Sequence, residues 1–311
     1  MSGPLLQVEG LTKVFRNPWT FRTFRAVSDL SFTLREGEIF GLIGHNGAGK
    51  TTTFKLLLGL LRPTRGRALF CDVPSASLEA RRQIGFLPEH PYFYEYLSVA
   101  ETLDFYARLC GLRGRERQSR VAELLRELRL EPKRDAPLRS LSKGTLQRVG
   151  IAQAIVHRPR LVILDEPMSG LDPGGRRAVR ELVRGWKEEG TTVVFSSHIL
   201  PDAETLCDRV GILAYGKLRE VVDLRGWARE STAAFRLQAR TASLPPELER
   251  FVLNGFDRST GTYTLHVPRE ALATVVSVLE RQGGEIESVL PIRPSLEERF
   301  LAYVRPEELT D

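Results

Sequence analysis

A glycine-rich stretch followed by a lysine and two threonines carries the clearest chemistry in this sequence. It comprises residues 44–52, Gly-His-Asn-Gly-Ala-Gly-Lys-Thr-Thr, and directly follows the apolar run Ile39–Ile43. Successive backbone N–H groups of such a loop converge on an anion, and the next helix presents its unpaired N–H groups and positive dipole end to the same anion. Lys50 adds a charge for the β- and γ-phosphates of a nucleotide, and Thr51 adds a hydroxyl ligand for Mg²⁺.

The segments around this loop decide between phosphate binding and an ordinary glycine turn. The apolar run before it and the helical pattern Phe54–Leu58 after it supply the order strand, loop, helix that phosphate binding requires. An aromatic side chain ahead of the loop can stack on a nucleotide base, and Phe15 is the first choice, although a packing role suits it equally. The predicted nucleotide-binding residues are Phe15, Val27, Gly44, His45, Asn46, Gly47, Ala48, Gly49, Lys50, Thr51 and Thr52.

Two acids and a histidine follow two further apolar runs. Leu161–Leu164 ends in Asp165-Glu166, and Thr191–Ser197 ends at His198. Continuous apolar runs of this kind suit strands that are buried on both faces of a parallel sheet. Loop solvation would explain the acids alone, and a structural role would explain the histidine alone. Because ligands bind beyond the carboxyl ends of parallel strands, however, we expect these side chains and the phosphate loop to share one crevice.

Two aromatic-rich segments join the predicted elements. Residues 15–25 connect the predicted strands Leu5–Val14 and Val27–Leu34. Residues 88–97 follow the short apolar segment Arg82–Leu87 and contain two prolines and four aromatic residues. This second segment is either a contact patch for a partner or a loop folded over its own core. The partner is favoured because aromatic residues are enriched at protein interfaces.

The middle of the chain has helical periodicity. Val99 to about Leu130 is predicted to be helical, with Val121, Leu124, Leu125 and Leu128 on one face. Pro132 and Pro137 end this stretch. A new helix is predicted from Ser142 to about His157, and Ser142 is well placed as its N-cap.

Length and composition indicate one large domain and one small domain of an ordinary globular protein. The 311 residues carry 45 Lys and Arg against 39 Asp and Glu, a mild excess that fits a nucleotide, an anionic membrane or nucleic acid equally well. The three cysteines have no metal-ligand spacing, and we expect free thiols in a reducing cytosol. Neither a bilayer-spanning apolar run nor a secretory signal is found, so a membrane role would need another chain.

After Lys217 the pattern changes to short alternating elements. Strands are predicted at Ala233–Ala239, Gly261–Val267 and Glu285–Leu290, and helices at Pro246–Leu253, Glu270–Gln282 and Ser295–Val304. This order predicts a small two-layer α+β domain. No constellation of catalytic residue types occurs in it.

Taken together, these motifs resemble the ATPase subunit of an ATP-binding cassette (ABC) transporter over roughly residues 5–222. The family's signature motif is matched at 141–147, its catalytic acids at 165–166, its dimer-seam loop at 169–172 and its switch histidine at 198. The resemblance implies an α/β fold: a P-loop NTPase core with a parallel sheet and an inserted helical subdomain at about 91–158. The implied domains are a nucleotide-binding domain at 1–222 and a small α+β accessory domain at 223–311.

The same resemblance implies the roles of the site residues. Glu166, His198 and Lys50 would be catalytic, and Thr51, Asp165 and Glu89 would hold Mg²⁺. Two cassettes would dimerise head to tail, with each ATP lying between one phosphate loop and the partner's signature segment, whose helix N-terminus would donate to the γ-phosphate. The signature residues contributed to that partner site would be Leu141, Ser142, Lys143, Gly144, Thr145 and Gln147.

The sequence departs from the family pattern at two positions. Glu89 stands where the family usually has Gln; a carboxylate also binds Mg²⁺, but it adds negative charge beside the other acids. Lys143 stands in place of the commoner glycine of the signature. The segment 294–300 resembles, more loosely, the accessory domain of ATPases of the ABC-2 exporter type.

The function predicted from these features is an ATP-hydrolysing subunit that drives an ABC-2 type exporter through nucleotide-driven homodimerisation. Its partner would be a separate transmembrane permease that contacts Pro91–Leu97, at the cytoplasmic face of the inner or plasma membrane, with no nucleic acid bound. The alternative is a soluble cassette ATPase that acts on ribosomes or nucleic acid. A regulatory module without turnover is a third hypothesis, and the catalytic acid and the switch histidine argue against it.

Overall fold

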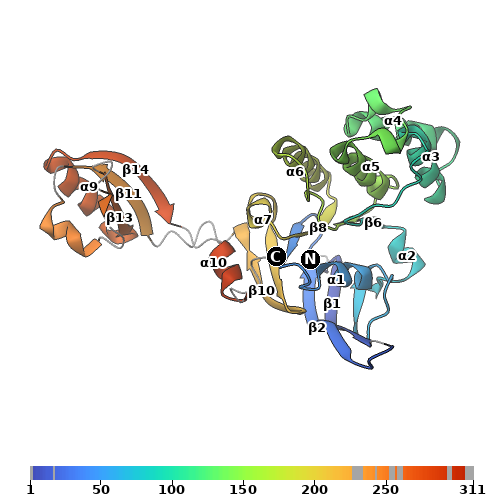
Figure 1. Ribbon diagram of the computed structural model, residues 1–311, viewed down its shortest axis with the longest axis horizontal. Coiled ribbons are helices and arrows are strands. Elements are labelled where there is room, and N and C mark those ends of the chain that lie inside the picture. The colour runs from blue at the N-terminus through green and yellow to red at the C-terminus, as the bar shows by residue number, and fades with distance from the viewer. Residues whose placement is uncertain are drawn as a thin grey trace. The chain divides into compact units, whose positions relative to one another are not determined.

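The computed structural model describes residues 3–16, 18–225, 234–241, 244–251, 256–257, 262–292 and 296–304. The chain forms two compact units (Figure 1), the first comprising Met1–Val222 with Phe300–Asp311 and the second Asp223–Arg299. The predicted 223–311 domain therefore ends too late. The described residues 300–304 belong to the first unit, where the Tyr303 hydroxyl donates to Glu220 at 3.4 Å.

The centre of the first unit is a six-stranded sheet with the order β10-β9-β3-β8-β7-β6. Its strands are β3 (Ile39–Ile43), β6 (Ile84–Leu87), β7 (Leu161–Leu164), β8 (Thr192–Ser197), β9 (Arg209–Ala214) and β10 (Lys217–Asp223). The pairs β3·β8, β3·β9, β6·β7 and β7·β8 are parallel. All residues of β3, β7 and β8 are buried, which confirms the sheet expected from their continuous apolar runs.

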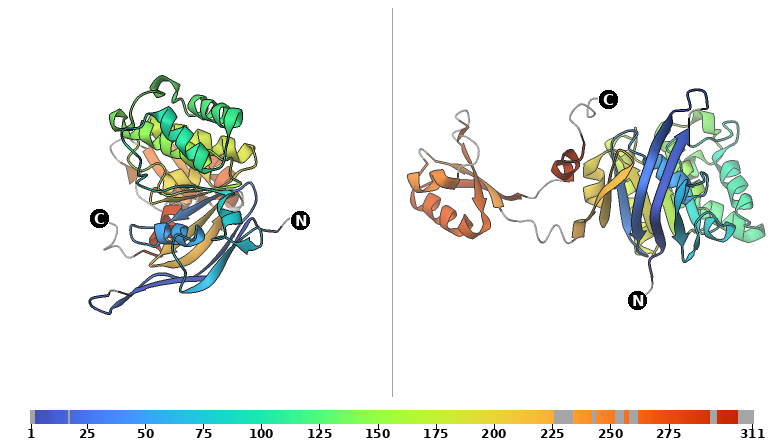
Figure 2. Two further views of the ribbon diagram at one scale, coloured as in Figure 1. Left: turned by 90° about the vertical axis from the view of Figure 1, so that its right-hand side faces the viewer. Right: turned by 90° about the horizontal axis from the view of Figure 1, so that it is seen from below.

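A second, antiparallel sheet has the order β2-β1-β4-β5. It comprises β1 (Leu6–Arg16), β2 (Thr23–Leu34), β4 (Arg65–Phe70) and β5 (Val73–Pro74). The segment 15–25, expected as a connection, is strand at both ends, because β1 and β2 continue their pairing to Arg16 opposite Thr23. Its ends thus form the tip of a long hairpin (Figure 2).

Helices pack around these two sheets. Next to the central sheet lie α1 (Lys50–Leu57), α2 (Leu78–Arg81), α6 (Pro173–Glu188) and α7 (Leu200–Leu206). The helices α3 (Val99–Leu109), α4 (Gly114–Glu127) and α5 (Lys143–Ile155) form a separate group, drawn in green in Figure 2, with the short 3₁₀ turns Glu131–Lys133 and Leu138–Ser140. The predicted helix 99–130 is broken at Gly111, whose φ of +90° no helix permits.

The second unit is an antiparallel sheet with the order β12-β13-β11-β14 and a helix, as the α+β pattern predicts. Its strands are β11 (Ala234–Arg240), β12 (Phe256–Asp257), β13 (Thr262–Pro268) and β14 (Glu285–Ile292), and α9 spans Leu272–Arg281. The 3₁₀ turns Pro246–Phe251 and Arg269–Ala271 complete it. Helix α10 spans Leu296–Leu301, and the boundary between the two units falls within it, after Arg299. The first turn replaces the expected helix at 246–253, and the predicted residues 233, 252–253, 261 and 294–295 lie outside the described residues.

The three cysteines are free thiols, as expected. Cys207 is buried against Gly41 of β3, where a Cβ on the glycine would lie 2.7 Å from the sulfur. Burial raises the pKa of both Cys207 and Cys110, so both remain protonated. Neither thiol has the depressed pKa of a reactive cysteine.

Arg120 joins α4 to the carboxyl end of α5, the helix that begins at the signature segment. Its guanidinium donates to the carbonyls of Val156 at 3.1 Å and Ile155 at 2.6 Å, and it pairs with Glu123 at 2.8 Å. These carbonyls lie at the helix end, where the chain itself supplies no donor and a positive charge is favoured.

We expect Arg120→Met to lower the free energy of unfolding by on the order of 3 kcal/mol, because two buried carbonyls lose a charged donor. Urea titration followed by circular dichroism measures this change. The control is Arg158→Gln, which removes an exposed arginine that also pairs with Glu123 at 2.7 Å and should change stability by less than about 1 kcal/mol. Equal losses in the two variants would contradict the assignment.

Candidate nucleotide-binding site

The phosphate loop between β3 and α1 depends on glycines at two close approaches. Gly49 has a φ of +108°, and a Cβ there would lie 2.5 Å from the carbonyl oxygen of Ala26. A Cβ on Gly44 would lie 2.5 Å from the carbonyl oxygen of Leu213. Only glycine fits both positions, so strand β2 and the end of β9 hold the loop tightly from two sides.

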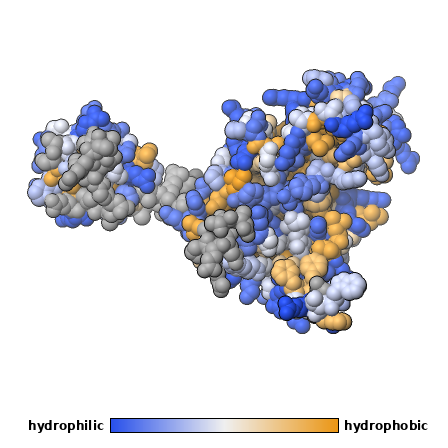
Figure 3. All heavy atoms as spheres, viewed as in Figure 1, coloured by the Kyte–Doolittle hydropathy of each residue, from blue (hydrophilic) through white to orange (hydrophobic). Residues whose placement is uncertain are grey.

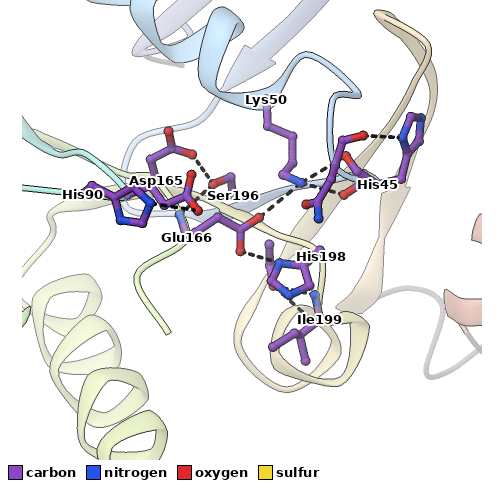
Figure 4. Close-up of polar contacts among 12 residues, drawn as sticks. His45, Lys50, His90, Asp165, Glu166, Ser196, His198 and Ile199 are labelled. Atoms are coloured by element: carbon purple, nitrogen blue, oxygen red, sulfur yellow. Dashed lines mark hydrogen bonds and ion pairs between the residues drawn. The ribbon is translucent and has the colours of Figure 1, made fainter. Parts of the chain in front are cut away.

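Lys50 is the first residue of α1, and its ammonium lies inside the loop (Figure 4). Its Nζ donates to the carbonyls of Gly44 at 2.6 Å and His45 at 3.3 Å. It also forms an ion pair with Glu166 Oε1 at 3.1 Å, and both side chains are more than nine-tenths buried. A buried pair of this kind is stable only while both charges keep their partners.

Asp165 and Glu166 follow β7 and are held by Ser196 of the neighbouring strand β8. The Ser196 hydroxyl donates to Asp165 Oδ1 at 2.6 Å and accepts from the Glu166 N–H at 2.8 Å. Glu166 has a φ of +49°, a strained value for a residue with a side chain. Ser196 therefore fixes both the first acid and the turn that presents the second (Figure 4).

The second carboxylate oxygen of Asp165 indicates whether a metal ion would fit at this site. Asp165 is 1% exposed, and its Oδ2 is buried with no hydrogen-bond partner among the described residues. A buried carboxylate oxygen without a donor is costly unless a cation or its water ligands satisfy it. The donor set therefore fits Mg²⁺.

His198 follows β8 and faces Glu166. Its Nδ1 donates to Glu166 Oε2 at 2.8 Å, so the Glu166 carboxylate lies between Lys50 and His198. The preceding Ser197 hydroxyl accepts from the Ile199 N–H at 2.9 Å and fixes the turn that carries the imidazole. The three residues expected to meet at the sheet edge do so (Figure 4).

The remaining predicted residues lie around this centre with differing exposure. Phe15 is 39% exposed, with the Lys13 ammonium 5.1 Å from its ring centroid. His45 lies at 5.1 Å from the Tyr215 ring, and Thr51 and Thr52 are half-buried on α1. Val27 is completely buried in the core, which contradicts a side-chain contact with nucleotide, because on β2 its side chain points into the core between the two sheets.

Glu89 lies in the loop after β6 and is partly exposed. Its carboxylate is 3.9 Å from His90 Nε2 (Figure 4), and no contact with Asp165 is found among the described residues. The structure therefore does not join Glu89 to the buried acids.

The signature segment forms the start of α5. Ser142 caps the helix by accepting from the Thr145 N–H at 3.3 Å, as expected. The Lys143 side chain lies over Gly170 of the dimer-seam loop, where a Cβ would meet its Cε at 2.9 Å. A cavity of about 770 Å³ lies beside this segment, between α5 and α6, with Ser142, Lys143 and Gly144 in its wall.

Gln147 was expected to contribute to a partner's nucleotide site, where its side chain would have to be exposed. It is buried, and its Nε2 donates to the carbonyl of Pro167 at 2.9 Å. Because Pro167 directly follows Glu166, this hydrogen bond connects the signature helix to the loop that carries Glu166. Thr145 is likewise buried, while Ser142 and Lys143 are exposed.

Comparison with known proteins identifies the family. Residues 27–169 match the profile described as "ABC transporter". An uncharacterized ABC transporter ATP-binding protein of Synechocystis sp. is 36% identical over 313 residues, 96% of this chain and 84% of the relative. The chain belongs to the ABC transporter ATP-binding proteins. The Nod factor export ATP-binding protein I of Ralstonia nicotianae is 36% identical over 218 residues, 70% of this chain and 66% of the relative.

Solved structures agree with this assignment. The dimeric ATP-binding cassette MJ0796 bound to ADP and Pi superposes with a TM-score of 0.66 at 25% identity, covering 71% of this chain and 99% of that chain. The expected P-loop ABC ATPase fold of the α/β class is thus confirmed. Cassettes of this family bind nucleotide, hydrolyse ATP and dimerise, so the chain is the ATPase subunit of a transporter. None of the described helices is long and apolar enough to cross a bilayer.

Ser196 is the site residue that sequence reasoning missed. Its only signal is position: it stands near the end of an apolar strand, two residues before His198. The parallel register pairs Leu164 with Phe195, which puts Ser196 level with Asp165. That pairing is not visible in the sequence.

We expect Ser196→Ala to lower kcat for ATP hydrolysis by about 10- to 100-fold, because a supporting hydrogen bond to both acids is lost. KM for ATP should stay within about twofold, since the phosphate loop is untouched. Steady-state ATPase assays measure both constants. Ser31→Ala, which removes a hydroxyl that accepts from the Gly10 N–H in the antiparallel sheet, is the control; an unchanged kcat for Ser196→Ala would exclude the positioning role.

Proposed function

We propose that this chain is the ATP-hydrolysing subunit of an ABC-2 type exporter and works as a homodimer on the cytoplasmic face of the plasma membrane. The observation that carries the proposal is the Glu166 carboxylate held between Lys50 and His198. A protein that only sensed nucleotide would need no acid at this position. The similarity to a Nod factor export protein supports an export direction.

In this proposal Lys50 exchanges one anionic partner for another. Its ammonium pairs with Glu166 in the structure, and a bound triphosphate offers more negative charge at the same loop. Release of the carboxylate from Lys50 frees it to accept a hydrogen bond from the attacking water, while His198 keeps its second oxygen oriented. Catalysis then consists of positioning and electrostatic stabilisation.

Mg²⁺ would be held by Asp165 and Thr51, with Glu89 as a further ligand from the loop after β6. When bound, the ion would neutralise phosphate charge. The buried, unsatisfied oxygen of Asp165 supports this assignment. Glu89 lies in an exposed loop, so its contribution to Mg²⁺ binding would depend on the Mg²⁺ concentration in the solvent.

The partner cassette would supply the other half of each site. Ser142 and Lys143 are exposed at the start of α5, and the helix N-terminus there favours an anion. Gln147 would act indirectly, by joining this helix to the loop of Glu166.

The permease would contact the aromatic loop Pro91–Leu97. Tyr92, Tyr94 and Tyr96 are 91%, 52% and 71% exposed, whereas Phe93 is buried and anchors the loop. Exposed tyrosines on an anchored loop are typical of a protein interface. The alternative of a ribosome- or nucleic-acid-directed ATPase has no comparable support, because the matched relatives are transporter ATP-binding proteins.

We expect Glu166→Gln to form a stable dimer in Mg·ATP, because substrate still binds while hydrolysis falls by at least about 100-fold. Light scattering should show a doubling of the 35.0 kDa monomer mass only with nucleotide. The matched control, Glu188→Gln, changes an exposed acid on α6 and should behave as wild type. A variant that binds ATP but stays monomeric would contradict a homodimer.

We expect Glu89→Gln to bind ATP more tightly than wild type at low Mg²⁺, since one negative charge near the acids and the triphosphate is removed. Affinity measured across a Mg²⁺ titration should converge once the ion is saturating. Glu95→Gln removes another exposed charge from the same loop and serves as the control. Identical curves for wild type and Glu89→Gln would show that Glu89 does not act at the metal.

A further inference from the structure

The tip of the β1–β2 hairpin combines aromatic and basic side chains without any acid. Between Glu9 and Asp29 the sequence contains no carboxylate. It contains four basic residues, Lys13, Arg16, Arg22 and Arg25, and four aromatic residues, Phe15, Trp19, Phe21 and Phe24. Neither the nucleotide site nor the proposed permease contact uses most of this set.

The aromatic side chains of this tip face solvent. Trp19, Phe21 and Phe24 are 89%, 67% and 63% exposed. Figure 3 shows apolar and strongly polar atoms side by side at the end of the first unit where the hairpin projects. Three large aromatics this exposed and this close together form a patch rather than scattered surface residues.

Within the part of the chain that the structure describes, the arginines beside them have no anionic partner. No carboxylate among the described residues lies within ion-pair distance of Arg16, Arg22 or Arg25. The Arg16 guanidinium lies 4.9 Å from the Phe21 ring centroid, and Arg25 donates to the Ser28 hydroxyl at 3.4 Å. Lys13 differs, because its Nζ donates to the Arg62 carbonyl at 2.8 Å and is engaged by the body of the unit.

We propose that this basic aromatic hairpin, residues 16–25, binds the surface of an anionic lipid bilayer. Trp19, Phe21 and Phe24 enter the interfacial layer, where amphipathic rings are favoured, and the three arginines meet lipid phosphates. A projecting, convex tip suits a flat, deformable surface better than a folded partner, which would need a complementary groove. Because the tip carries three arginines and no carboxylate, its charge is complementary to that of an anionic lipid surface.

This inference is independent of the export proposal, because the hairpin would bind a lipid surface that contains no permease. Each arginine near an anionic surface contributes about fivefold to partitioning, so removing three should weaken binding by about 100-fold. The arginines touch neither the phosphate loop nor the acids, so their removal should leave ATP hydrolysis in solution unchanged. Failure of lipid binding is therefore distinguishable from failure of the ATPase assignment.

The test is co-sedimentation of the full chain with phosphatidylcholine vesicles, with and without one-third phosphatidylglycerol. We expect binding only to the anionic vesicles, weakened by high salt. The variant Arg16→Gln/Arg22→Gln/Arg25→Gln should lose about 100-fold, and Trp19→Ser/Phe21→Ser/Phe24→Ser should also lose binding at constant charge. The control Tyr92→Ser/Tyr94→Ser/Tyr96→Ser removes three exposed aromatics elsewhere and should bind as wild type.

Three outcomes would overturn the proposal: no binding of wild type to anionic vesicles, binding that the hairpin variants retain, or equal loss in the tyrosine control. A labelled single-stranded oligonucleotide is tested in parallel. Binding of that probe without vesicle binding, lost in the arginine variant, would assign the hairpin to nucleic acid instead. Near-ultraviolet circular dichroism of each variant verifies that the fold is intact.

Discussion

The buried carboxylate of Glu166 is the group on which the rest of the site depends. It is 8% exposed and lies between the ammonium of Lys50 and the imidazole of His198. A buried charge is tolerable only when its partners are held in place, and each partner comes from the end of a different strand. The parallel register of β3, β7 and β8 is therefore a requirement of this one electrostatic arrangement.

The same acid is linked mechanically to the signature segment. Glu166 is followed by Pro167, whose carbonyl accepts from Gln147 of α5, and the dimer-seam loop beyond it lies under the Lys143 side chain. Arg120 then holds the far end of α5 to α4. A shift of α5 would thus be transmitted through Pro167 to the neighbouring Glu166.

Sequence reasoning succeeded where a function depends on the type of one residue at a given position in the chain. It failed where the function depends on which residues become neighbours in space. Lys50, Asp165, Glu166 and His198 were placed correctly at the sheet edge because each follows a continuous apolar run. Val27 is completely buried on β2, and the face of a strand on which a side chain lies is not visible from its position in the chain. The strand ends at 15–16 and 23–25 were assigned to the connection, because their polar and aromatic residues hide the strand pairing.

By itself the sequence determined the family, the phosphate loop, the parallel strands and the chemical roles open to the acids. These follow from residue type and local spacing, which the chain carries in one dimension. Only the tertiary structure decided that Ser196 holds both acids, that Gln147 serves the Pro167 carbonyl, and that residues from Phe300 return to the first unit. These contacts join residues 20 to 83 positions apart. Strand register and helix packing create them, and both are set by burial of the whole core.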